Sequence, residues 1–314
     1  MDFSRLAAVS YDDPDRPGQR LIRVYYQVGS HIRESCYDTD NGWYVRGDNI
    51  VANHAKPRSP IAVTNLAQGK KTSVFFLAED NQLCRRVRTT SKAGDRGVWT
   101  DGPIVQPTVA ISASSQLTAV RTDNEENIRL YYQSTDNMVR GMVSYGDDGS
   151  WQPSDLELDK VLPGTSLCAI SGDGQVRLFY QADDKTVKER YSDPSTEWKP
   201  SRVRSWTADN KAPITAVAWN YSTNKFAIRV YTVQNGILVE LVFDQSRGGW
   251  SQNPVVTAET IPNIPGMDQP ASCAATTQDN QGKLTIFYQP SKQVIAQYDS
   301  VAKRVPLGIS TARD

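Results

Sequence analysis

One strand-like pattern occurs six times along this chain of 314 residues. In its clearest copy, Ile22-Arg23-Val24-Tyr25-Tyr26-Gln27 is followed by a tight turn and then by Ile32-Arg33-Glu34. The positions equivalent to Arg23 are 50, 56, 48, 52 and 56 residues apart, and they hold Arg23, Ser73, Arg129, Arg177, Arg229 and Thr285. A strand pattern that returns at nearly constant spacing indicates one supersecondary unit of about 50 residues, repeated along the chain.

Two further series of residues keep the same phase. Tryptophans recur 56, 52, 47 and 52 residues apart, at Trp43, Trp99, Trp151, Trp198 and Trp250. Small apolar segments recur at Ala7–Val9, Ala62–Val63, Ala119–Val120, Ala169–Ile170, Ala216–Val217 and Ala274–Ala275. Because three independent series agree in phase, the repeat does not depend on any single motif.

Each repeat divides into four short strand-like segments separated by turn residues, and no stretch shows a sustained helical period. Four-stranded units of this length close radially, which leaves only short, protected sheet edges. The sequence therefore predicts an all-β protein, a six-bladed β-propeller with four antiparallel strands per blade, as a single domain over residues 1–314. The approximate blades are 5–55, 56–112, 113–163, 164–211, 212–268 and 269–314.

Composition excludes several classes of partner. The chain has 35 basic and 35 acidic residues, whereas binding to nucleic-acid phosphates requires a basic stripe. No apolar run approaches the ~18 residues that a membrane-spanning helix needs, so we expect no membrane insertion. Neither the histidines, His31 and His54, nor the four cysteines form a cluster with metal-ligand spacing. We therefore expect no metal and no other cofactor.

The first residues, Met1-Asp2-Phe3-Ser4-Arg5, lack the basic head and apolar core of a secretory signal peptide. We expect a cytoplasmic protein, or one that is released or reaches the cell surface by a non-classical route.

Charged residues recur in the middle of the strand pattern, where blades would stack. An Arg precedes a Glu by 11, 12 and 11 residues, in Arg23–Glu34, Arg177–Glu189 and Arg229–Glu240. This spacing across a hairpin places the two side chains about opposite one another. For any one pair, a plain cross-strand ion pair is the alternative. Recurrence beside the tryptophan series favours a crevice for a sugar, since charged groups bind hydroxyls and an indole covers an apolar sugar face.

These residues resemble the fungal fucose-specific lectins. The resemblance rests on Arg23-Val24-Tyr25-Tyr26-Gln27, Ile32-Arg33-Glu34-Ser35, Gly42-Trp43-Tyr44 and Leu162-Pro163-Gly164-Thr165, and at the repeat level it covers the whole chain. It implies a six-bladed propeller, usually a homodimer, with L-fucose sites in the clefts between adjacent blades. It also implies that an Arg and a Glu come from one blade, while a Trp and the aromatic residue three positions past the Glu position come from the next blade.

Carried over residue by residue, the resemblance implies an uneven ring of sites. The cleft between blades four and five matches in full. It holds Arg177, Glu189, Phe243 and Trp250. We expect this cleft to be the best occupied.

Two other clefts match in part, and we expect them to bind as well. Between blades one and two, Arg23, Glu34 and Trp99 match, but Arg88 takes the aromatic position. Between blades five and six, the matching residues are Arg229, Glu240 and Tyr298, and blade six has no Trp.

The last three clefts are expected to be weakened or inactive. Between blades three and four, Arg129 and Trp198 remain, while Gly141 and Ser192 replace the Glu and the aromatic residue. Between blades two and three, Ser73 and Arg85 replace the Arg and the Glu. Between blades six and one, Thr285 faces Tyr37 and Trp43, and blade six offers no clear carboxylate.

Two other functions fit the sequence less well. A glycoside hydrolase needs two carboxylates flanking the scissile bond, but each cleft has one, beside an Arg that favours its charged form. A protein-binding propeller of the WD40 type carries Gly-His and Trp-Asp signatures that are missing here. The expected function is therefore that of a non-catalytic, multivalent lectin for L-fucose on oligosaccharides or glycoproteins, such as the glycans of a host. The protein-binding scaffold is the alternative, and the hydrolase comes after it.

Overall fold

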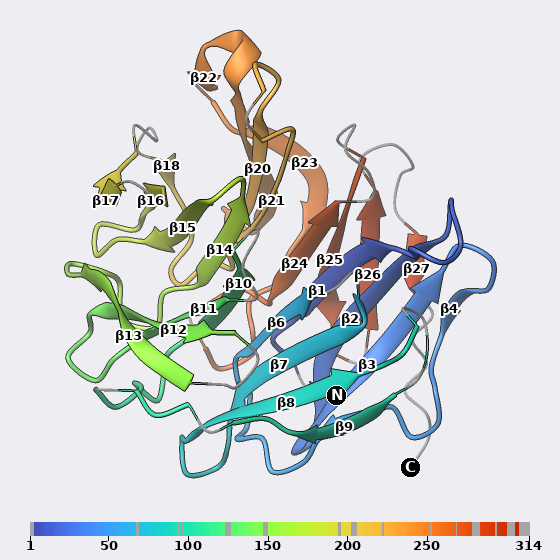
Figure 1. Ribbon diagram of the computed structural model, residues 1–314. Helices are drawn as coiled ribbons and strands as arrows, with labels where there is room; N and C mark the ends of the chain where they lie inside the picture. Colours follow the sequence, from blue (N-terminus) through green and yellow to red (C-terminus); the bar gives the residue numbers. More distant parts are fainter. Residues whose placement is uncertain are drawn as a thin grey trace.

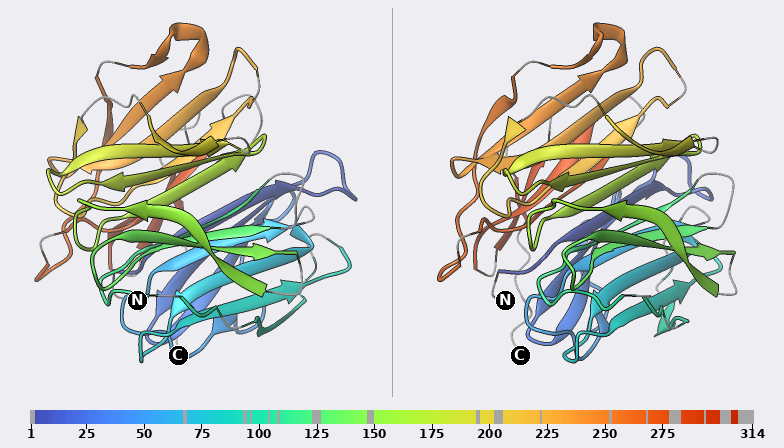
Figure 2. Two further views of the ribbon diagram at one scale, coloured as in Figure 1. Left: turned by 60° about the vertical axis from the view of Figure 1, so that its left-hand side comes forward. Right: turned by 90° about the vertical axis from the view of Figure 1, so that its left-hand side faces the viewer.

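The computed structural model forms six antiparallel β-sheets arranged around a central axis (Figure 1, Figure 2). It describes residues 3–66, 69–92, 95, 97–103, 105–107, 109–122, 127–146, 150–193, 196–201, 206–221, 223–251, 253–267, 269–277, 283–292, 294–299 and 305–307. The neighbours of each inner strand are the inner strands of the adjacent sheets, and the last lies against the first. This closure makes the molecule a six-bladed propeller, as the sequence predicts.

The first three blades follow the order of the chain. Blade one contains β1 (Ala7–Asp12), β2 (Arg20–Val28), β3 (His31–Asp38), β4 (Gly42–Tyr44) and β5 (Ile50–Ala52), which also pairs with β3. Blade two contains β6 (Ile61–Leu66), β7 (Lys71–Leu77), β8 (Leu83–Thr89) and β9 (Val98–Asp101). Blade three contains β10 (Leu117–Arg121), β11 (Ile128–Gln133), β12 (Val139–Tyr145) and β13 (Ser150–Leu158).

The other three blades complete the circle. Blade four contains β14 (Leu167–Gly172), β15 (Gln175–Gln181), β16 (Thr186–Asp193), β17 (Thr196–Pro200) and β18 (Trp206–Thr207). Blade five contains β19 (Thr215–Trp219), β20 (Ala227–Gln234), β21 (Ile237–Asp244), the short 3-10 helix η2 (Gln245–Arg247), β22 (Gly249–Trp250) and β23 (Val255–Thr260). Blade six contains β24 (Cys273–Thr277), β25 (Leu284–Ser291), β26 (Val294–Asp299) and β27 (Val305–Leu307).

The small apolar series forms the innermost strands. Alanines such as Ala62, Ala119 and Ala216 line the narrow space on the axis, where inner strands of all six blades converge. In Figure 1, β1, β6, β10, β14 and β24 gather near the middle of the molecule. Larger side chains would not fit where strands approach this closely, which explains why the inner strands are rich in alanine.

In blades one, three and four, the glutamine that ends the motif ties the blade to the loop that leads to the next blade. Gln27, Gln133 and Gln181 are buried. The Gln27 amide nitrogen donates to the carbonyl of Lys56 at 2.8 Å, and its oxygen accepts from the backbone of Ser59 at 2.9 Å. Gln133 accepts from the backbone of Gly164. These bonds satisfy backbone groups of the loops between blades, which would otherwise be buried without a partner.

The tryptophan series packs the blades against one another. Each ring meets an aromatic ring of the preceding blade edge-on, with centroids 5.6–6.3 Å apart. The pairs are Tyr25–Trp99, Phe75–Trp151, Tyr131–Trp198, Phe179–Trp250 and Phe287–Trp43. Edge-to-face contacts of this kind are stabilising beyond the area they bury, so each tryptophan has a packing role besides any role in binding.

The strand register corrects one expectation. Glu34 lies opposite Tyr25 and Arg23 lies opposite Cys36, so Arg23 and Glu34 are not directly across from one another. Glu189 likewise faces Phe179 while Arg177 faces Tyr191. The Arg and the Glu are therefore diagonal neighbours on one face of the blade, because side chains two residues apart on a strand share a face.

Among the described residues, no helix is long and apolar enough to cross a membrane. Cys36, Cys84, Cys168 and Cys273 are all free thiols.

Candidate functional site

The cleft between blades four and five contains a buried ion pair. An Nη1 hydrogen of Arg177 is donated to Oε1 of Glu189, with the two atoms 2.7 Å apart. The side chain of Glu189 is 0% exposed and that of Arg177 is 13% exposed. Nη2 of Arg177 also donates to the side-chain oxygen of Gln175 at 3.2 Å. The guanidinium therefore forms the part of the pair that reaches the surface.

Aromatic rings surround this guanidinium. Its carbon lies 5.4 Å from the ring centre of Tyr191, 5.1 Å from that of Phe226 and 6.0 Å from that of Phe243. Phe243 packs against Trp250, with ring centres 5.4 Å apart. The structure thus brings together Arg177, Glu189, Phe243 and Trp250, the four residues that the sequence predicts for this cleft.

Three buried polar atoms in this cleft have no hydrogen-bond partner among the described residues. They are Nε of Arg177, Oε2 of Glu189 and Nε1 of Trp250. Buried polar atoms normally have partners, because burial without one costs about 1–3 kcal/mol. An acceptor and two donors without partners in one cleft can bind hydroxyl groups of a ligand.

A cavity of about 430 Å³ opens beside Arg177. Its walls include Phe243 of blade five and also Tyr221 and Phe226, from the loop between β19 and β20. The ring of Tyr221 packs so closely over Gly172 that a Cβ there would lie 2.3 Å from it. Sequence reasoning missed Tyr221 and Phe226, because the repeat pattern does not include this loop.

The cleft between blades five and six has a looser version of the pair. Nε of Arg229 lies 3.3 Å from Oε1 of Glu240, and the two side chains are 19% and 21% exposed. The hydroxyl of Tyr231 donates to Oε2 of Glu240 at 2.5 Å. Burial and the neighbouring Glu240 both raise the pKa of Tyr231, so this phenol remains a donor. The guanidinium lies 5.0 Å from the ring centre of Trp219.

Two aromatic residues of this cleft differ from the predicted arrangement. Tyr298 pairs with Ile286, at the position that Leu241 has in blade five, and so it lies two residues before the position of Phe243. It still lies on the face turned towards blade five, packed against the same apolar cluster as Phe243. Trp219, at the end of the inner strand β19, covers the guanidinium of Arg229, and blade six has no tryptophan at the position of Trp250.

The cleft between blades one and two is closed by an arginine. Nη1 of Arg88 lies 3.1 Å from both carboxylate oxygens of Glu34, and the guanidinium covers the ring of Trp99 at 5.1 Å. Arg23 instead donates to the carbonyls of Ile22 and Tyr37, at 2.9 and 3.2 Å. The predicted pair of Arg23 and Glu34 is therefore not formed. Arg88 occupies the position of the aromatic residue and forms the ion pair with Glu34 instead of Arg23.

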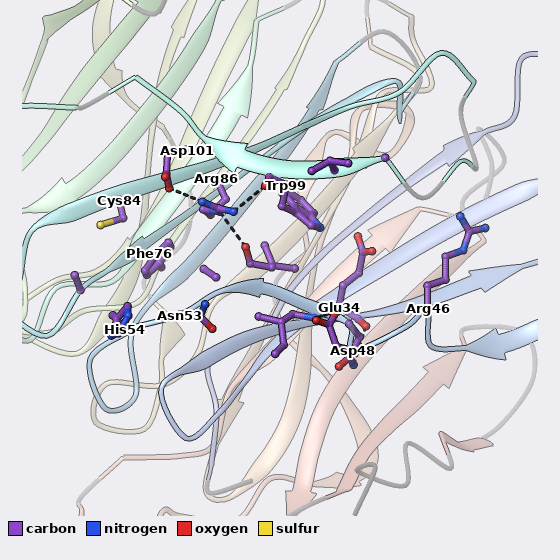
Figure 3. A pocket seen from close by; sticks show the side chains of 17 residues that line it. Glu34, Arg46, Asp48, Asn53, His54, Phe76, Cys84, Arg86, Trp99 and Asp101 are labelled. Atoms are coloured by element: carbon purple, nitrogen blue, oxygen red, sulfur yellow. Dashed lines mark hydrogen bonds and ion pairs between the residues drawn. The ribbon is translucent and has the colours of Figure 1, made fainter. Parts of the chain in front are cut away.

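A cavity of about 810 Å³ lies on the outer side of this closed cleft (Figure 3). In the wall of this cavity, Arg86 donates hydrogen bonds to Asp101 and to the backbone carbonyl of Trp99. Glu34 and Arg46 also line the cavity. Because Arg88 already binds Glu34, this cavity offers a ligand no free pair of the kind found between blades four and five.

In the cleft between blades three and four, another strand supplies a carboxylate. Gly141 stands opposite Tyr131, at the position where blades one, four and five carry Glu, and a Cβ at Gly141 would lie 2.4 Å from Oγ of Ser154. A bulge in the pairing of β12 with β13 brings Asp155 into the cleft. There Nε1 of Trp198 donates to Oδ1 of Asp155 at 3.2 Å. The tryptophan is thus already bonded. Arg129 contributes a buried Nε without a partner among the described residues.

The two remaining clefts have lost the pair. Between blades two and three, Arg85 donates to the hydroxyl of Ser73, with nitrogen–oxygen distances of 3.2 and 3.0 Å. Between blades six and one, Gln297 stands opposite Phe287, at the position of the Glu, and its oxygen accepts from Nε1 of Trp43 at 3.1 Å. Tyr37 packs on Trp43 with ring centres 5.4 Å apart, and Thr285 is fully buried.

Comparison with known proteins gives a consistent result. The family described as fungal fucose-specific lectin matches residues 5–308. The fucose-specific lectin of Aleuria aurantia is 28% identical over 307 residues, which cover 95% of this chain and 92% of that protein. The fucose-specific lectin of Aspergillus fumigatus is 25% identical over 295 residues, with 90% and 88% covered.

Solved structures agree. The crystal structure of the Aleuria aurantia lectin, a six-bladed β-propeller, matches with a TM-score of 0.77 and 28% identity, over 97% of this chain and 94% of that one. A variant of that lectin in complex with α-methyl-L-fucoside matches with a TM-score of 0.78 and 27% identity, with the same coverage. The chain belongs to the fungal fucose-specific lectin family, and it is a lectin rather than an enzyme.

Proposed function

We propose that this protein binds L-fucose on fucosylated glycans, and that the cleft between blades four and five is its principal site. One observation carries the proposal. In that cleft Glu189 is buried and paired with Arg177, which reaches the surface, and Oε2 of Glu189 and Nε1 of Trp250 have no partner among the described residues.

The chemistry of the cleft matches a deoxy sugar. Oε2 of Glu189 can accept a hydrogen bond from one hydroxyl, while Arg177 and Trp250 donate to sugar oxygens. The rings of Phe226 and Phe243 offer an apolar wall for the methyl group and the apolar face of the sugar ring. Because donors, acceptor and rings all lie on strands or packed loops, the cleft is preformed, which limits the entropy lost on binding.

We expect a second, weaker site between blades five and six. There Arg229 and Glu240 are paired at 3.3 Å beneath Trp219, but Tyr231 already donates to Glu240. Both sites on one chain allow multivalent attachment to a glycan-coated surface, such as that of a host cell, and a homodimer would double their number. Within the described part of the chain, the contacts in the clefts do not favour the protein-binding scaffold.

Calorimetric titration with L-fucose tests the proposal, with D-galactose as the control sugar. We expect about two sites per chain in the wild type and loss of the tighter one in Glu189→Gln. The reason is that the Gln amide has one acceptor oxygen, whereas the carboxylate has two. Glu34→Gln is the matched control, since the equivalent cleft is closed by Arg88. No heat with millimolar fucose would refute the proposed function, and equal losses in the two variants would refute the assignment of the site. Light scattering measures the oligomeric state.

A further inference from the structure

The cleft between blades two and three contains a buried arginine where other blades carry a carboxylate. Arg85 lies opposite Phe75 on β7, as Glu189 lies opposite Phe179 in blade four. Only 7% of Arg85 is exposed. Its partner position holds Ser73 in place of an arginine. This cleft therefore carries one positive charge, whereas Arg177 and Glu189 balance one another between blades four and five.

Arg85 differs from its neighbours on the same strand. Arg86 forms an ion pair with Asp101, and Arg88 binds Glu34 with an N–O distance of 3.1 Å. Arg85 has no carboxylate partner among the described residues. Its only hydrogen bonds there run from Nε and Nη2 to the neutral hydroxyl of Ser73. Burial lowers the pKa of Arg85 to about 10, because no neighbouring acid offsets the loss of water around the charge.

Two donors in this cleft have no acceptor among the residues that the structure describes. Nη1 of Arg85 makes no hydrogen bond within the described part of the chain, and this nitrogen is not fully buried. Nε1 of Trp151 is buried without a partner there. The guanidinium carbon lies 5.8 Å from the ring centre of Trp151 and 5.7 Å from that of Phe75. The guanidinium of Arg85 therefore lies against both rings.

We propose that this cleft binds an acidic saccharide, whose anionic group accepts hydrogen bonds from Nη1 of Arg85 and Nε1 of Trp151. A guanidinium without a counter-ion in a partly dry cleft gains most from an anion, since charge-assisted hydrogen bonds are about twice as strong as neutral ones. Trp151 stands at the position that Trp250 has in blade five, so the anion would lie at the place in this cleft that is equivalent to the proposed fucose site. The inference rests on the proposed function only in taking the ligand to be a sugar.

The test compares matched acidic and neutral sugars by calorimetry at low salt. The pairs are 3′-sialyllactose with lactose, glucuronic acid with glucose, and galactose 6-sulfate with galactose, so that a carboxylate and a sulfate are distinguished. We expect at least one acid to bind the wild type roughly tenfold or more tightly than its neutral partner. Added salt should weaken that binding and leave fucose binding unchanged.

Arg85→Met tests the residue. Methionine fits between the two rings without a charge, so the variant should lose roughly tenfold or more of its affinity for the acid while keeping fucose binding between blades four and five. Arg85→Lys keeps a charge and should retain part of the affinity. Glu189→Gln is the reciprocal control: it should lose the tighter fucose site, between blades four and five, and keep its affinity for the acid. If Arg85→Met does not fold, the indole N–H resonance of Trp151 in the wild type, assigned with Trp151→Phe, gives a second readout.

The outcomes separate the two proposals. Absence of binding by every acid, an unchanged affinity in Arg85→Met, or an indole resonance of Trp151 that does not move on addition of the acid would overturn this inference while leaving the fucose proposal intact. Acid binding that depends on Arg85, in a protein that gives no heat with fucose, would support this inference and refute the proposed function.

Discussion

Removal of Arg177 should destabilise the protein far more than removal of its partner's charge. In Arg177→Met, the carboxylate of Glu189 stays 0% exposed and loses the hydrogen bond of 2.7 Å that balances its charge. Breaking a buried pair in this way costs about 3–5 kcal/mol of unfolding free energy. In Glu189→Gln, no charge is buried alone, because Arg177 is 13% exposed and keeps Gln175 and three aromatic rings as neighbours. That change should cost about 1–2 kcal/mol.

The double variant Arg177→Met/Glu189→Leu sharpens the prediction. Two apolar side chains of similar volume remove both desolvated charges, so the double variant should unfold within about 1 kcal/mol of the wild type. Urea unfolding without sugar measures all three variants, and the double variant should bind no fucose between blades four and five despite its stability. The prediction is refuted if the losses of unfolding free energy in the two single variants add up in the double variant. It is also refuted if Glu189→Gln is less stable than Arg177→Met.

Three further predictions concern other parts of the ring. Arg88→Phe should free the carboxylate of Glu34 and place an aromatic ring where Phe243 stands in blade five, so calorimetry should detect one additional fucose site; an unchanged number of sites would show that Arg88 is not what closes the cleft. Burial raises the pKa of the Cys36 and Cys168 thiols to about 12, so their contribution to stability is present below about pH 9 and is lost as the pH rises from there towards 12. At pH 8 the half-buried Cys84 should react first with a thiol reagent in the native state, and Cys84→Ser should abolish that first phase.

The fold could be predicted from the sequence because its signals are local and repeated. A strand pattern that comes back six times must place equivalent residues at equivalent positions, whatever the details of packing. Turn residues and the alanine series located the strands, and the spacing of Trp43 to Trp250 gave the phase. The packing role of those tryptophans did not follow from spacing, since an edge-on contact with the preceding blade appears only when the blades are stacked.

The candidate site was predicted where all its parts followed the repeat. Arg177, Glu189, Phe243 and Trp250 hold their positions in the pattern, and the structure brings them together. Prediction was poorer where a part came from outside the pattern. Asp155 enters through a bulge, Tyr221 and Phe226 come from a loop, and Trp219 covers Arg229 from an inner strand.

The sequence alone determined the all-β class, the six blades and the residues available to each cleft. These properties follow from a local pattern that is repeated along the chain. Only the tertiary structure decided which charges meet. Arg88 and Glu34 are 54 residues apart, and their ion pair depends on the approach of two blades. The partners of a buried charge are set by distances of about 3 Å across an interface, which strand periodicity does not specify. For that reason the closed cleft at Glu34, the borrowed carboxylate of Asp155 and the unpaired Arg85 became visible only in the folded molecule.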